Sequence, residues 1–311
     1  MKKVLLTGAG GFIGRNLAEC LKGKYSLYCP SSKELDLLDQ GAVEEYLWEH
    51  QFDVILHSAN RNDTRKKTTP YDSLDGNLRM FFHLERCQSM YGKMLYFGSG
   101  AEYGREHYVP DMEEGYLGRH IPKDAYGFSK YVMAKTCEHS RNIYELCLFG
   151  VFGKYEEWER RFISNAICRA VKGKHITIQQ NVLFDYLWVE DLALIVEWFV
   201  EQEPCHRRYN VCRGQKIDLY SLALLVRQIL DTGSGAGSQM PISSGGSQTV
   251  QGGSLGIVVA KEGWKREYTG NNSRLLQEMG SFQFTAFEDS IHALCNYYRE
   301  NLDEIGIEKL V

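Results

Sequence analysis

Short apolar runs alternate with longer stretches of helical periodicity through the first half of the chain. Strands are predicted over five of these runs: Lys3–Thr7, Ser26–Cys29, Val54–Ser58, Met94–Gly98 and Tyr144–Phe149. Helices are predicted between them, at 14–22, Gly41–His50, Leu78–Tyr91 and Ala125–Arg141. Strands that alternate with helices in this way predict an α/β domain in which helices cover a parallel sheet.

Beyond Gly153 the alternation is less regular. Helices are predicted at Phe162–Lys172 and Asp191–Glu201, a strand over HITI at 175–178, and a short buried strand at 209–211. We therefore predict a first domain over 1–153, to which 180–213 returns, and a smaller α/β domain formed by 154–179 and 214–311. Within the second, residues 232–256 are dominated by Gly, Ser and Gln, which cannot bury enough apolar surface to fold. We interpret that segment as a flexible surface loop.

Composition narrows the class of protein. The chain has 311 residues, 43% of them hydrophobic and 24% charged, with a net charge of −4, so we expect a globular protein without a nucleic-acid partner. No run approaches the roughly 18 apolar residues of a membrane span. The nine Cys lack CxxC pairs and are odd in number, which favours reduced thiols, a cytoplasmic location and no metal site.

A glycine-rich turn follows the first predicted strand and opens the first helix. Gly8, Gly11 and Gly14 have the spacing GxxGxxG, with Phe12 and Ile13 between the last two. The first Gly allows a tight turn, the second allows the backbone to approach a pyrophosphate, and the third allows the helix to pack on the sheet. Free amides at the helix N-terminus would bind the phosphates. The turn therefore predicts a dinucleotide site in a doubly wound Rossmann domain.

The residues after the second strand bear on the choice of cofactor. An NAD site usually has an Asp or Glu there to hold the ribose 2′-hydroxyl. Ser31, Ser32 and Lys33 offer two hydroxyls and an ammonium instead, which suits a 2′-phosphate and favours NADP. Alternatively, these residues form an ordinary polar turn and Glu34 or Asp36 holds the ribose of NAD. Both possibilities stay open.

Tyr126 and Lys130 are four residues apart on a predicted helix, so they share one face. A nearby cation favours the phenolate and lowers the pKa of a tyrosine, which makes the pair suitable for proton transfer. Ser99, in the Gly-rich stretch FGSGAEYG, precedes them by about thirty residues. The glycine turn, the serine and the Tyr/Lys pair occur in one order along the chain.

These motifs resemble the extended short-chain dehydrogenase/reductase family, in particular its nucleotide-sugar epimerases, dehydratases and 4-keto reductases. The resemblance covers nearly the whole chain: TGAGGFIG, ELDLLD, HSA at 57–59, LDGNLRMFF, FGSGAEYG, YxxxK, FDYLWVEDLA, YNVCRG and NNSRLLQEMG. It implies that Tyr126 exchanges a proton with a sugar oxygen, that Ser99 hydrogen-bonds the same oxygen, and that Lys130 holds the nicotinamide ribose. It also implies that the cofactor site includes Asp36 and Leu37 near the adenine, Ser58 and Ala59 beside the cofactor, and Asn77 as a brace.

Departures from the family pattern separate its reactions. Gly100 and Ala101 stand where 4,6-dehydratases carry an acid pair, and Ala101 also replaces the Cys of GDP-fucose synthase-like epimerising reductases. The segment GKYEEWERRF offers no His to complete that pair. Phe184 replaces the family's phosphate-binding Arg. Gly100 and Ala101 are therefore expected to line the substrate site, and the diphosphate must find other cations, for which Lys154, Arg161 and Arg266 are candidates.

The resemblance implies a Rossmann domain with a smaller C-terminal substrate domain. It favours an NAD(P)-dependent reductase of a 4-keto-6-deoxy nucleotide sugar, with Tyr126 as proton donor. The alternatives are a nucleotide-sugar 4-epimerase with tightly bound NAD and a non-catalytic dinucleotide-binding protein. A homodimer is also expected, through a four-helix interface of Leu78–Tyr91 and Ala125–Arg141. On the first helix, apolar side chains occupy more of the circumference than one sheet-facing stripe needs: Met80, Phe81, Leu84, Cys87 and Met90 follow helical spacing, and Leu78 and Phe82 lie beside it.

Overall fold

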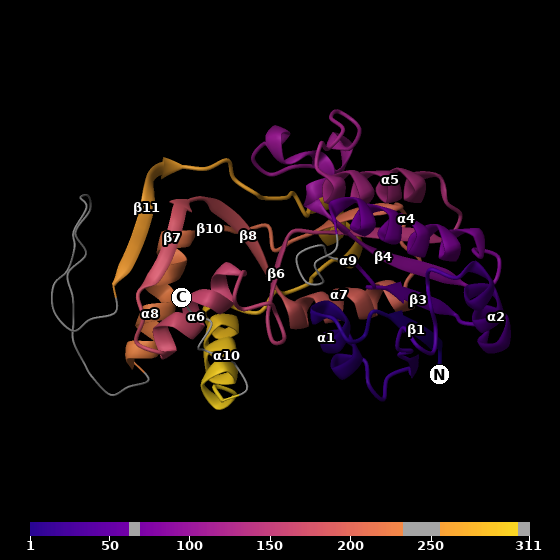
Figure 1. Ribbon diagram of the computed structural model, residues 1–311, viewed down its shortest axis with the longest axis horizontal. Helices are drawn as coiled ribbons and strands as arrows, with labels where there is room; N and C mark the ends of the chain where they lie inside the picture. Colours follow the sequence, from indigo (N-terminus) through magenta and orange to yellow (C-terminus); the bar gives the residue numbers. More distant parts are fainter. Residues whose placement is uncertain (62–68, 233–255, 304–311) are drawn as a thin grey trace.

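The computed structural model describes residues 1–61, 69–232 and 256–303 (Figure 1). Its largest element is a six-stranded, all-parallel sheet in the order β2-β1-β3-β4-β5-β9. The strands are β1 (Lys3–Thr7), β2 (Ser26–Tyr28), β3 (Val54–His57), β4 (Lys93–Ser99), β5 (Ile143–Leu148) and β9 (Arg208–Val211). Most of these strands are buried along their length, as expected when helices cover both faces of a parallel sheet.

Helices cover the two faces of this sheet. Alternate strand residues such as Val4 and Leu6 form one apolar cluster with α1 (Phe12–Cys20), α7 (Val189–Glu201) and α9 (Ser273–Met279). Their neighbours in the strands, such as Leu5 and Ile55, form another with α2 (Gln40–His50), α4 (Pro70–Arg86) and α5 (Ala125–His139). The predicted doubly wound α/β fold is therefore confirmed (Figure 1).

The remaining strands form two small sheets that share a third cluster. One has the order β10-β8-β6 and the other pairs β11 with β7, and helices α6, α8 and α10 pack on them. Their bounds are β6 (Gly150–Phe152), α6 (Phe162–Val171), β7 (Ile176–Asn181), β8 (Leu183–Trp188), β10 (Lys216–Asp218), α8 (Leu219–Thr232), β11 (Ile257–Trp264) and α10 (Phe287–Glu300). Within the predicted return segment 180–213, α7 and β9 pack in the large sheet's layers, whereas β8 pairs with β6 and β10. The domain boundaries stay a prediction.

Helix α4 differs most from its prediction, because it begins at Pro70 rather than Leu78. Thr69 accepts a hydrogen bond from the Asp72 amide (3.1 Å), and Asp72 accepts one from the Thr69 amide (3.0 Å). This capping box and the proline at the first helical position start a polar turn that apolar periodicity does not mark. The other predicted elements end within three residues of their predicted bounds.

The apolar residues of α4 that suggested a dimer face lie mostly inside the protomer. Met80, Phe81, Leu84 and Cys87 are at most 7% exposed and pack against the large sheet and α2. These four residues form the stripe that faces the sheet, and the surplus beside it consists of Leu78 and Phe82, so the dimer stays a prediction. Phe82 and Leu78 are only partly buried.

The Gly/Ser-rich segment is described only at its ends. Thr232 is the last residue of α8, and Gly256 lies beside β7, where its carbonyl accepts from the Ile176 amide (3.0 Å). Thr232 therefore belongs to a helix, and Gly256 directly precedes β11 (Ile257–Trp264). Residues 233–255 lie outside the described part of the chain, so the flexible loop stays a prediction. Among the described helices, none is long and apolar enough to cross a membrane.

Candidate active site

The glycine turn brings the start of α1 against the end of β3. Gly8 has φ of +72°, and a Cβ there would lie 2.6 Å from the Cα of Ala59. A Cβ on Gly14 would lie 2.1 Å from the Gly8 carbonyl oxygen, whereas one on Gly10 would meet nothing within 4 Å. Gly11 precedes the first residue of α1, and its amide donates to the Gly8 carbonyl (2.9 Å). The fold itself therefore requires Gly8 and Gly14, and the helix opens with free amides suited to a pyrophosphate.

Side chains tie the carboxyl ends of β1 and β3 together beside this turn. The Thr7 hydroxyl lies 2.9 Å from His57 Nδ1 and accepts from the Ala59 amide (3.3 Å). Burial and the nearby Lys130 ammonium lower the pKa of His57 to about 3, so its imidazole is neutral at physiological pH. Ser58 and Ala59, both half-buried, follow β3 at this edge of the sheet, and their contact with a cofactor stays a prediction.

Asn77 is committed to the protein's own backbone. Its side-chain oxygen accepts from the Arg61 amide (2.7 Å) and its amide donates to the Arg61 carbonyl (3.0 Å). It is 3% exposed, and the adjacent Gly76 leaves room for the Arg61 side chain. The brace implied by the family resemblance thus holds the segment that follows β3, and contact of Asn77 with a cofactor stays a prediction.

The turn after β2 contains a contact that residue types alone did not reveal. Glu34 folds back on Ser31, accepting from its amide (2.7 Å) and from its hydroxyl, and these bonds lower the pKa of Glu34. Its carboxylate therefore engages Ser31, one of the three residues predicted to bind a 2′-phosphate. Ser32 and Lys33 are exposed, while Asp36 accepts from the Leu38 amide (3.0 Å) and Leu37 is buried.

Ser99, Tyr126 and Lys130 come together at the carboxyl end of β4. Ser99 ends this strand and accepts from the Ala101 amide (3.3 Å). Tyr126 is the second residue of α5, is 36% exposed, and lies with its ring centroid 5.8 Å from Lys130 Nζ. The buried Lys130 donates to the Phe97 carbonyl (2.9 Å). Gly127 lets α5 approach, because a Cβ there would lie 2.8 Å from the Ala101 carbonyl oxygen.

Tyr268 is a site residue that the sequence analysis missed. Its hydroxyl donates to the Leu148 carbonyl (3.5 Å), is close enough to Ser99 for that hydroxyl to affect its pKa, and lies where a Cβ on Gly100 would be only 2.6 Å away. Its ring lies 5.0 Å from those of Tyr108 and Phe149, and burial together with Tyr108 raises its pKa well above the usual range. No motif marks it. The backbone of Tyr268 pairs with that of β8 on both sides of Phe184, which fixes its position through tertiary contacts.

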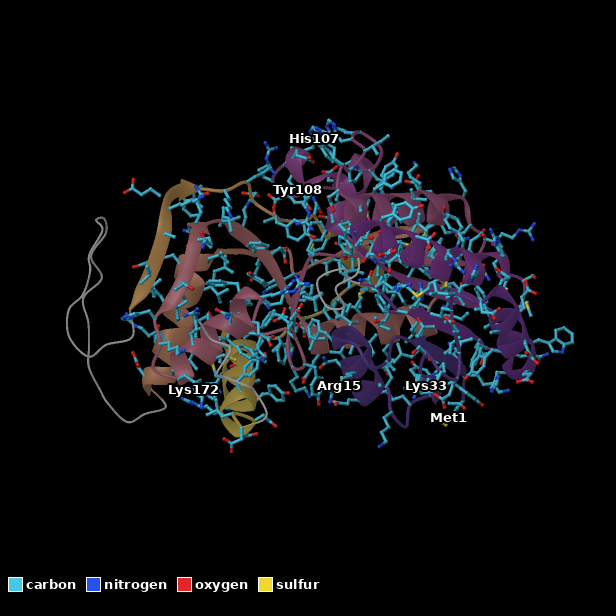
Figure 2. All side chains as sticks on the ribbon, viewed as in Figure 1. Met1, Arg15, Lys33, His107, Tyr108 and Lys172 are labelled. Atoms are coloured by element: carbon cyan, nitrogen blue, oxygen red, sulfur yellow. The ribbon has the colours of Figure 1, made fainter. Side chains whose placement is uncertain are left out.

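The candidate substrate residues fall into two groups. Gly100 and Ala101 are buried in the 3₁₀ turn after Ser99, and Arg266 donates to the Tyr108 carbonyl (3.0 Å), so these three lie around the site. Lys154 is instead paired with Glu19 (3.3 Å) and Glu190 (3.9 Å). Arg161 is the N-cap residue of α6, and its positive charge partly opposes the burial that raises the pKa of Glu156. Figure 2 shows Tyr108 near the upper rim of the molecule and Lys33 near the lower one.

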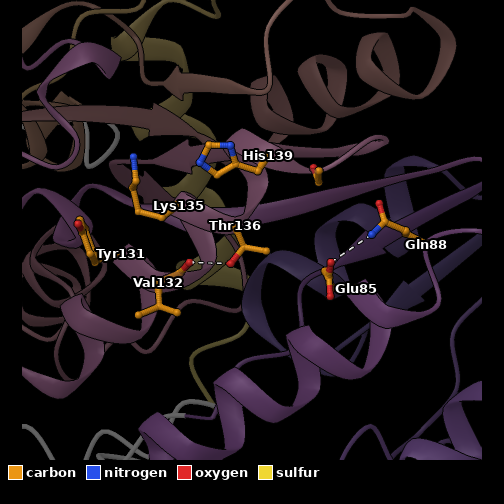
Figure 3. A pocket seen from close by; sticks show the side chains of 8 residues that line it. Glu85, Gln88, Tyr131, Val132, Lys135, Thr136 and His139 are labelled. Carbon is orange, nitrogen blue, oxygen red and sulfur yellow. Dashed lines mark hydrogen bonds between the residues drawn. The ribbon is translucent and has the colours of Figure 1, made fainter.

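An open groove of about 550 Å³ lies between α4 and α5, away from this chemistry (Figure 3). It is lined by Glu85, Gln88, Tyr131, Val132, Lys135, Thr136, His139 and Ser140. None of the three predicted catalytic residues contributes to it, so it is not the candidate active site. Within the described residues, no three His, Cys, Asp or Glu side chains gather as metal ligands.

Comparison with known proteins places this geometry in a family. Residues 4–212 match the NAD dependent epimerase/dehydratase family. GDP-L-colitose synthase of Yersinia pseudotuberculosis is 26% identical over 252 residues, which cover 73% of this chain and 82% of the relative.

Two solved structures have a similar fold. GDP-L-fucose synthetase of Naegleria fowleri bound to NADP has a TM-score of 0.76 at 16% identity, covering 97% of this chain and 94% of that one. UDP-glucose 4-epimerase of Thermotoga maritima with UDP-glucose has a TM-score of 0.75 at 17% identity, covering 96% and 99%. The family match includes the glycine turn, Ser99 and the Tyr126/Lys130 pair. The chain therefore belongs to the NAD dependent epimerase/dehydratase family and is an NAD(P)-dependent enzyme of the nucleotide-sugar epimerase and reductase group.

Proposed function

We propose that the protein reduces the keto group of a 4-keto-6-deoxy nucleotide sugar. The observation that carries this proposal is the meeting of Ser99, Tyr126 and Lys130 at one end of β4 without an acid at Gly100 or Ala101. The bound dinucleotide supplies a hydride to the carbonyl carbon. Tyr126 gives its phenolic proton to the carbonyl oxygen, which becomes a hydroxyl, and Ser99 donates a hydrogen bond to that oxygen. Lys130 provides positive charge beside the resulting phenolate.

Dehydration is disfavoured by the surroundings of Ser99. Water elimination needs an acid and a base at the sugar, and the nearest carboxyl group in sequence is Glu102. That side chain is fully buried and paired with Arg208. It is therefore unable to reach a substrate that lies over Ser99.

One observation favours the alternative, a nucleotide-sugar 4-epimerase that retains NAD. The Glu34 carboxylate on Ser31 would repel a 2′-phosphate and leaves the ribose end suited to NAD. A 4-epimerase uses the same Ser99, Tyr126 and Lys130 and returns the hydride to the opposite face of the same carbon.

The test begins with the protein as purified. A reductase should elute from gel filtration without a nicotinamide absorbance and should oxidise NADPH or NADH stoichiometrically with one member of a panel of nucleotide 4-keto-6-deoxy sugars. Protein that carries NAD through gel filtration and interconverts UDP-glucose and UDP-galactose would replace the reductase by the epimerase. Dinucleotide binding with neither activity would identify a non-catalytic protein.

We also propose a homodimer and a cytoplasmic location. Phe128 of α5 is 37% exposed, and Tyr131 and Val132 line the neighbouring groove. These side chains, with the partly buried Phe82, are better candidates for a partner surface than the buried residues of α4. Light scattering should give a dimer for the wild type and a monomer for Phe128→Glu. A monomeric wild type at micromolar concentration rejects the dimer.

The proposed cytoplasmic location is supported by the cysteines. All nine thiols are free, which supports a reducing compartment.

A further inference from the structure

A single buried guanidinium lies beneath the segment that carries Ser99. Arg208, on β9, donates through Nε to Glu145 on β5 (2.5 Å) and through Nη2 to Glu102, three residues after Ser99. Its Nη1 donates to the Glu114 carbonyl (3.1 Å) and lies 3.5 Å from a carboxylate oxygen of Glu138 on α5. The side chains of Glu102 and Glu145 are 0% exposed and that of Arg208 is 4% exposed. One side chain thus joins β5, β9, the 3₁₀ turn after Ser99 and the helix that carries Tyr126.

The contacts of this cluster continue into the main chain next to Ser99. A Cβ on Gly98 would lie 2.1 Å from Glu145 Oε1, so the Glu145 carboxylate occupies the space that any other residue at 98 would need. On the other side of Ser99, the Tyr268 hydroxyl occupies the equivalent space over Gly100. Ser99 is therefore flanked by two glycines, each required by a different side chain. The sequence FGSGAEYG records both contacts, but its spacing does not reveal which side chains make them.

The charges of the cluster do not balance if every group is ionised. Glu102 and Glu145 share one guanidinium in a site closed to water, and Glu138, which also faces Arg208, is 30% exposed and paired with Lys135. Burial and the adjacent Glu145 raise the pKa of Glu102 well above its usual range. A proton held between the two carboxyl groups would leave one carboxylate for one guanidinium, which avoids an unpaired buried charge.

We propose that Arg208, acting through Glu102 and Glu145, is a positioning residue that holds the Ser99 segment in register with α5, with the two glutamates sharing one proton. This inference rests on the proposed function for its kinetic readout, because Ser99 is there assigned to the reacting oxygen. The side chain of Arg208 is 4% exposed and contacts Glu102, Glu138 and Glu145 and the Glu114 carbonyl, so it acts through these groups. Its guanidinium fork suits two carboxyl groups on different strands, which a lysine ammonium cannot hold in one geometry.

The first test is Arg208→Ala, with Arg207→Met as its matched control. Arg207 is the preceding residue, half-buried, and its guanidinium lies over the Tyr144 ring (4.5 Å) rather than in the cluster. Arg208→Ala should lower kcat by about 100-fold, the cost expected from displacing a reacting group by roughly 1 Å, with little change in the KM for the dinucleotide. Arg207→Met should retain the wild-type kcat.

Chemical rescue separates positioning from general stability. Guanidinium chloride, at concentrations too low to unfold the protein, should restore part of the kcat of Arg208→Ala by filling the vacated site. Methylammonium chloride at the same concentration should not, and Arg208→Lys should remain slow. Rescue of the unfolding midpoint without rescue of kcat would show that the cluster only stabilises the fold and would overturn the positioning role.

A second readout needs no substrate. Backbone hydrogen exchange across 99–104 should accelerate in Arg208→Ala, slow again with guanidinium, and stay at the wild-type rate in Arg207→Met. If the wild type turns over no 4-keto sugar, the proposed function fails while this measurement still tests the positioning. Unchanged exchange in Arg208→Ala, in protein that remains folded by circular dichroism, overturns the positioning whatever the activity.

The shared proton is tested by Glu102→Gln. A folded-state pKa raised above the unfolded value stabilises the protein at low pH, and this contribution is lost as the pH rises through the folded pKa. The other groups that face this site are Glu145, Cys147, Arg208, Glu138, Cys137, Tyr103, Tyr96 and Glu114. They are common to both proteins, so the difference in unfolding midpoint between wild type and variant isolates Glu102. The unfolding midpoint of Glu102→Gln should rise relative to that of the wild type as the pH increases from 5 towards 8. A difference independent of pH overturns the shared proton.

Discussion

The large sheet and the two small sheets build their parts of the site in different ways. In the part of the chain built on the large sheet, several glycines are required where backbone segments approach, such as Gly14 on the Gly8 carbonyl and Gly127 on the Ala101 carbonyl, although the space over Gly98 is filled by the Glu145 side chain. In the C-terminal part, the contribution is a side chain, Tyr268, brought to Ser99 because its backbone pairs with β8. Close approaches of both kinds leave glycines in the sequence, but the spacing of the glycines does not identify the distant side chain, such as Tyr268, that lies against them.

The strands of the two parts also differ in how far their side chains are buried. β1, β3, β4, β5 and β9 are nearly continuous buried runs. β11, which pairs with β7 across about eighty residues of chain, has the exposed side chains Val258, Val259 and Trp264. The strands of the large sheet can therefore be recognised from local apolar runs, whereas the place of β11 depends on its pairing with β7. Substitutions in the first half should therefore affect catalysis, cofactor choice and stability, and the substitution considered in the second half should affect stability.

The largest effect is expected in the catalytic pair of the first half. Tyr126→Phe removes the transferable proton and keeps the ring, so kcat should fall by about 10²- to 10⁴-fold while dinucleotide affinity is nearly unchanged. The matched control is Tyr131→Phe, one turn along the same helix, where the phenol lines the α4/α5 groove. Near-wild-type kcat in Tyr126→Phe removes this residue from the mechanism.

The backbone approaches of the first half are tested without cofactor by two alanine substitutions in one turn. Gly14→Ala places a Cβ 2.1 Å from the Gly8 carbonyl oxygen, whereas Gly10→Ala places one in open space. Overpacking of this kind should lower the free energy of unfolding by about 3 kcal/mol in Gly14→Ala. Gly10→Ala should change it by less than about 0.5 kcal/mol. Equal urea midpoints for the two variants would contradict the assigned role of Gly14.

A buried acid in the C-terminal part should make the stability of the protein depend on pH. Glu156 precedes α6, accepts from the Ser164 hydroxyl (2.6 Å), and has its pKa raised to about 7 by burial. Because the folded pKa exceeds the unfolded value, its stabilising contribution is complete at acidic pH and is lost as the pH rises through about 7. The free energy of unfolding of Glu156→Gln should therefore increase relative to that of the wild type by on the order of 2 to 3 kcal/mol between pH 5 and 8.

The control for this prediction is Glu159→Gln, three residues further along and exposed. Its unfolding midpoint should follow that of the wild type at each pH. A Glu156→Gln curve parallel to that of the wild type would show that Glu156 is ionised throughout.

The smallest expected effect is on cofactor choice, at the exposed edge of the first half. Glu34→Gln removes the carboxylate from Ser31 but keeps an acceptor, so the ratio of NADP to NAD affinity should rise several-fold. Ser31→Asp should shift the ratio the other way. Fluorescence titration with both dinucleotides measures the ratio, and Glu49→Gln on α2 is the control. An unchanged ratio in Glu34→Gln would show that Glu34 does not influence cofactor choice.

Much of the first half could be predicted because its signals are local. The five strand-like runs, the glycine turn and the Tyr126/Lys130 spacing each lie within a few residues of chain. Helix α4 shows the limit even there, since its first two turns are specified by Thr69, Pro70 and Asp72 rather than by apolar periodicity. The contact of Glu34 with Ser31 is equally local in sequence, but residue types alone do not specify a backbone bend.

The family, the parallel sheet and the glycine, serine and Tyr/Lys motifs could be recognised in the sequence, because a period of apolar side chains and a run of glycines are properties of adjacent positions. Which side chains meet across long separations depends on the tertiary structure. Arg208 joins Glu102 from 106 residues away and Glu145 from 63, and Tyr268 reaches Ser99 through its pairing with β8. Such contacts arise from how the strands are ordered in the sheets, and strand order is set by the sum of packing over the whole core rather than by any one segment.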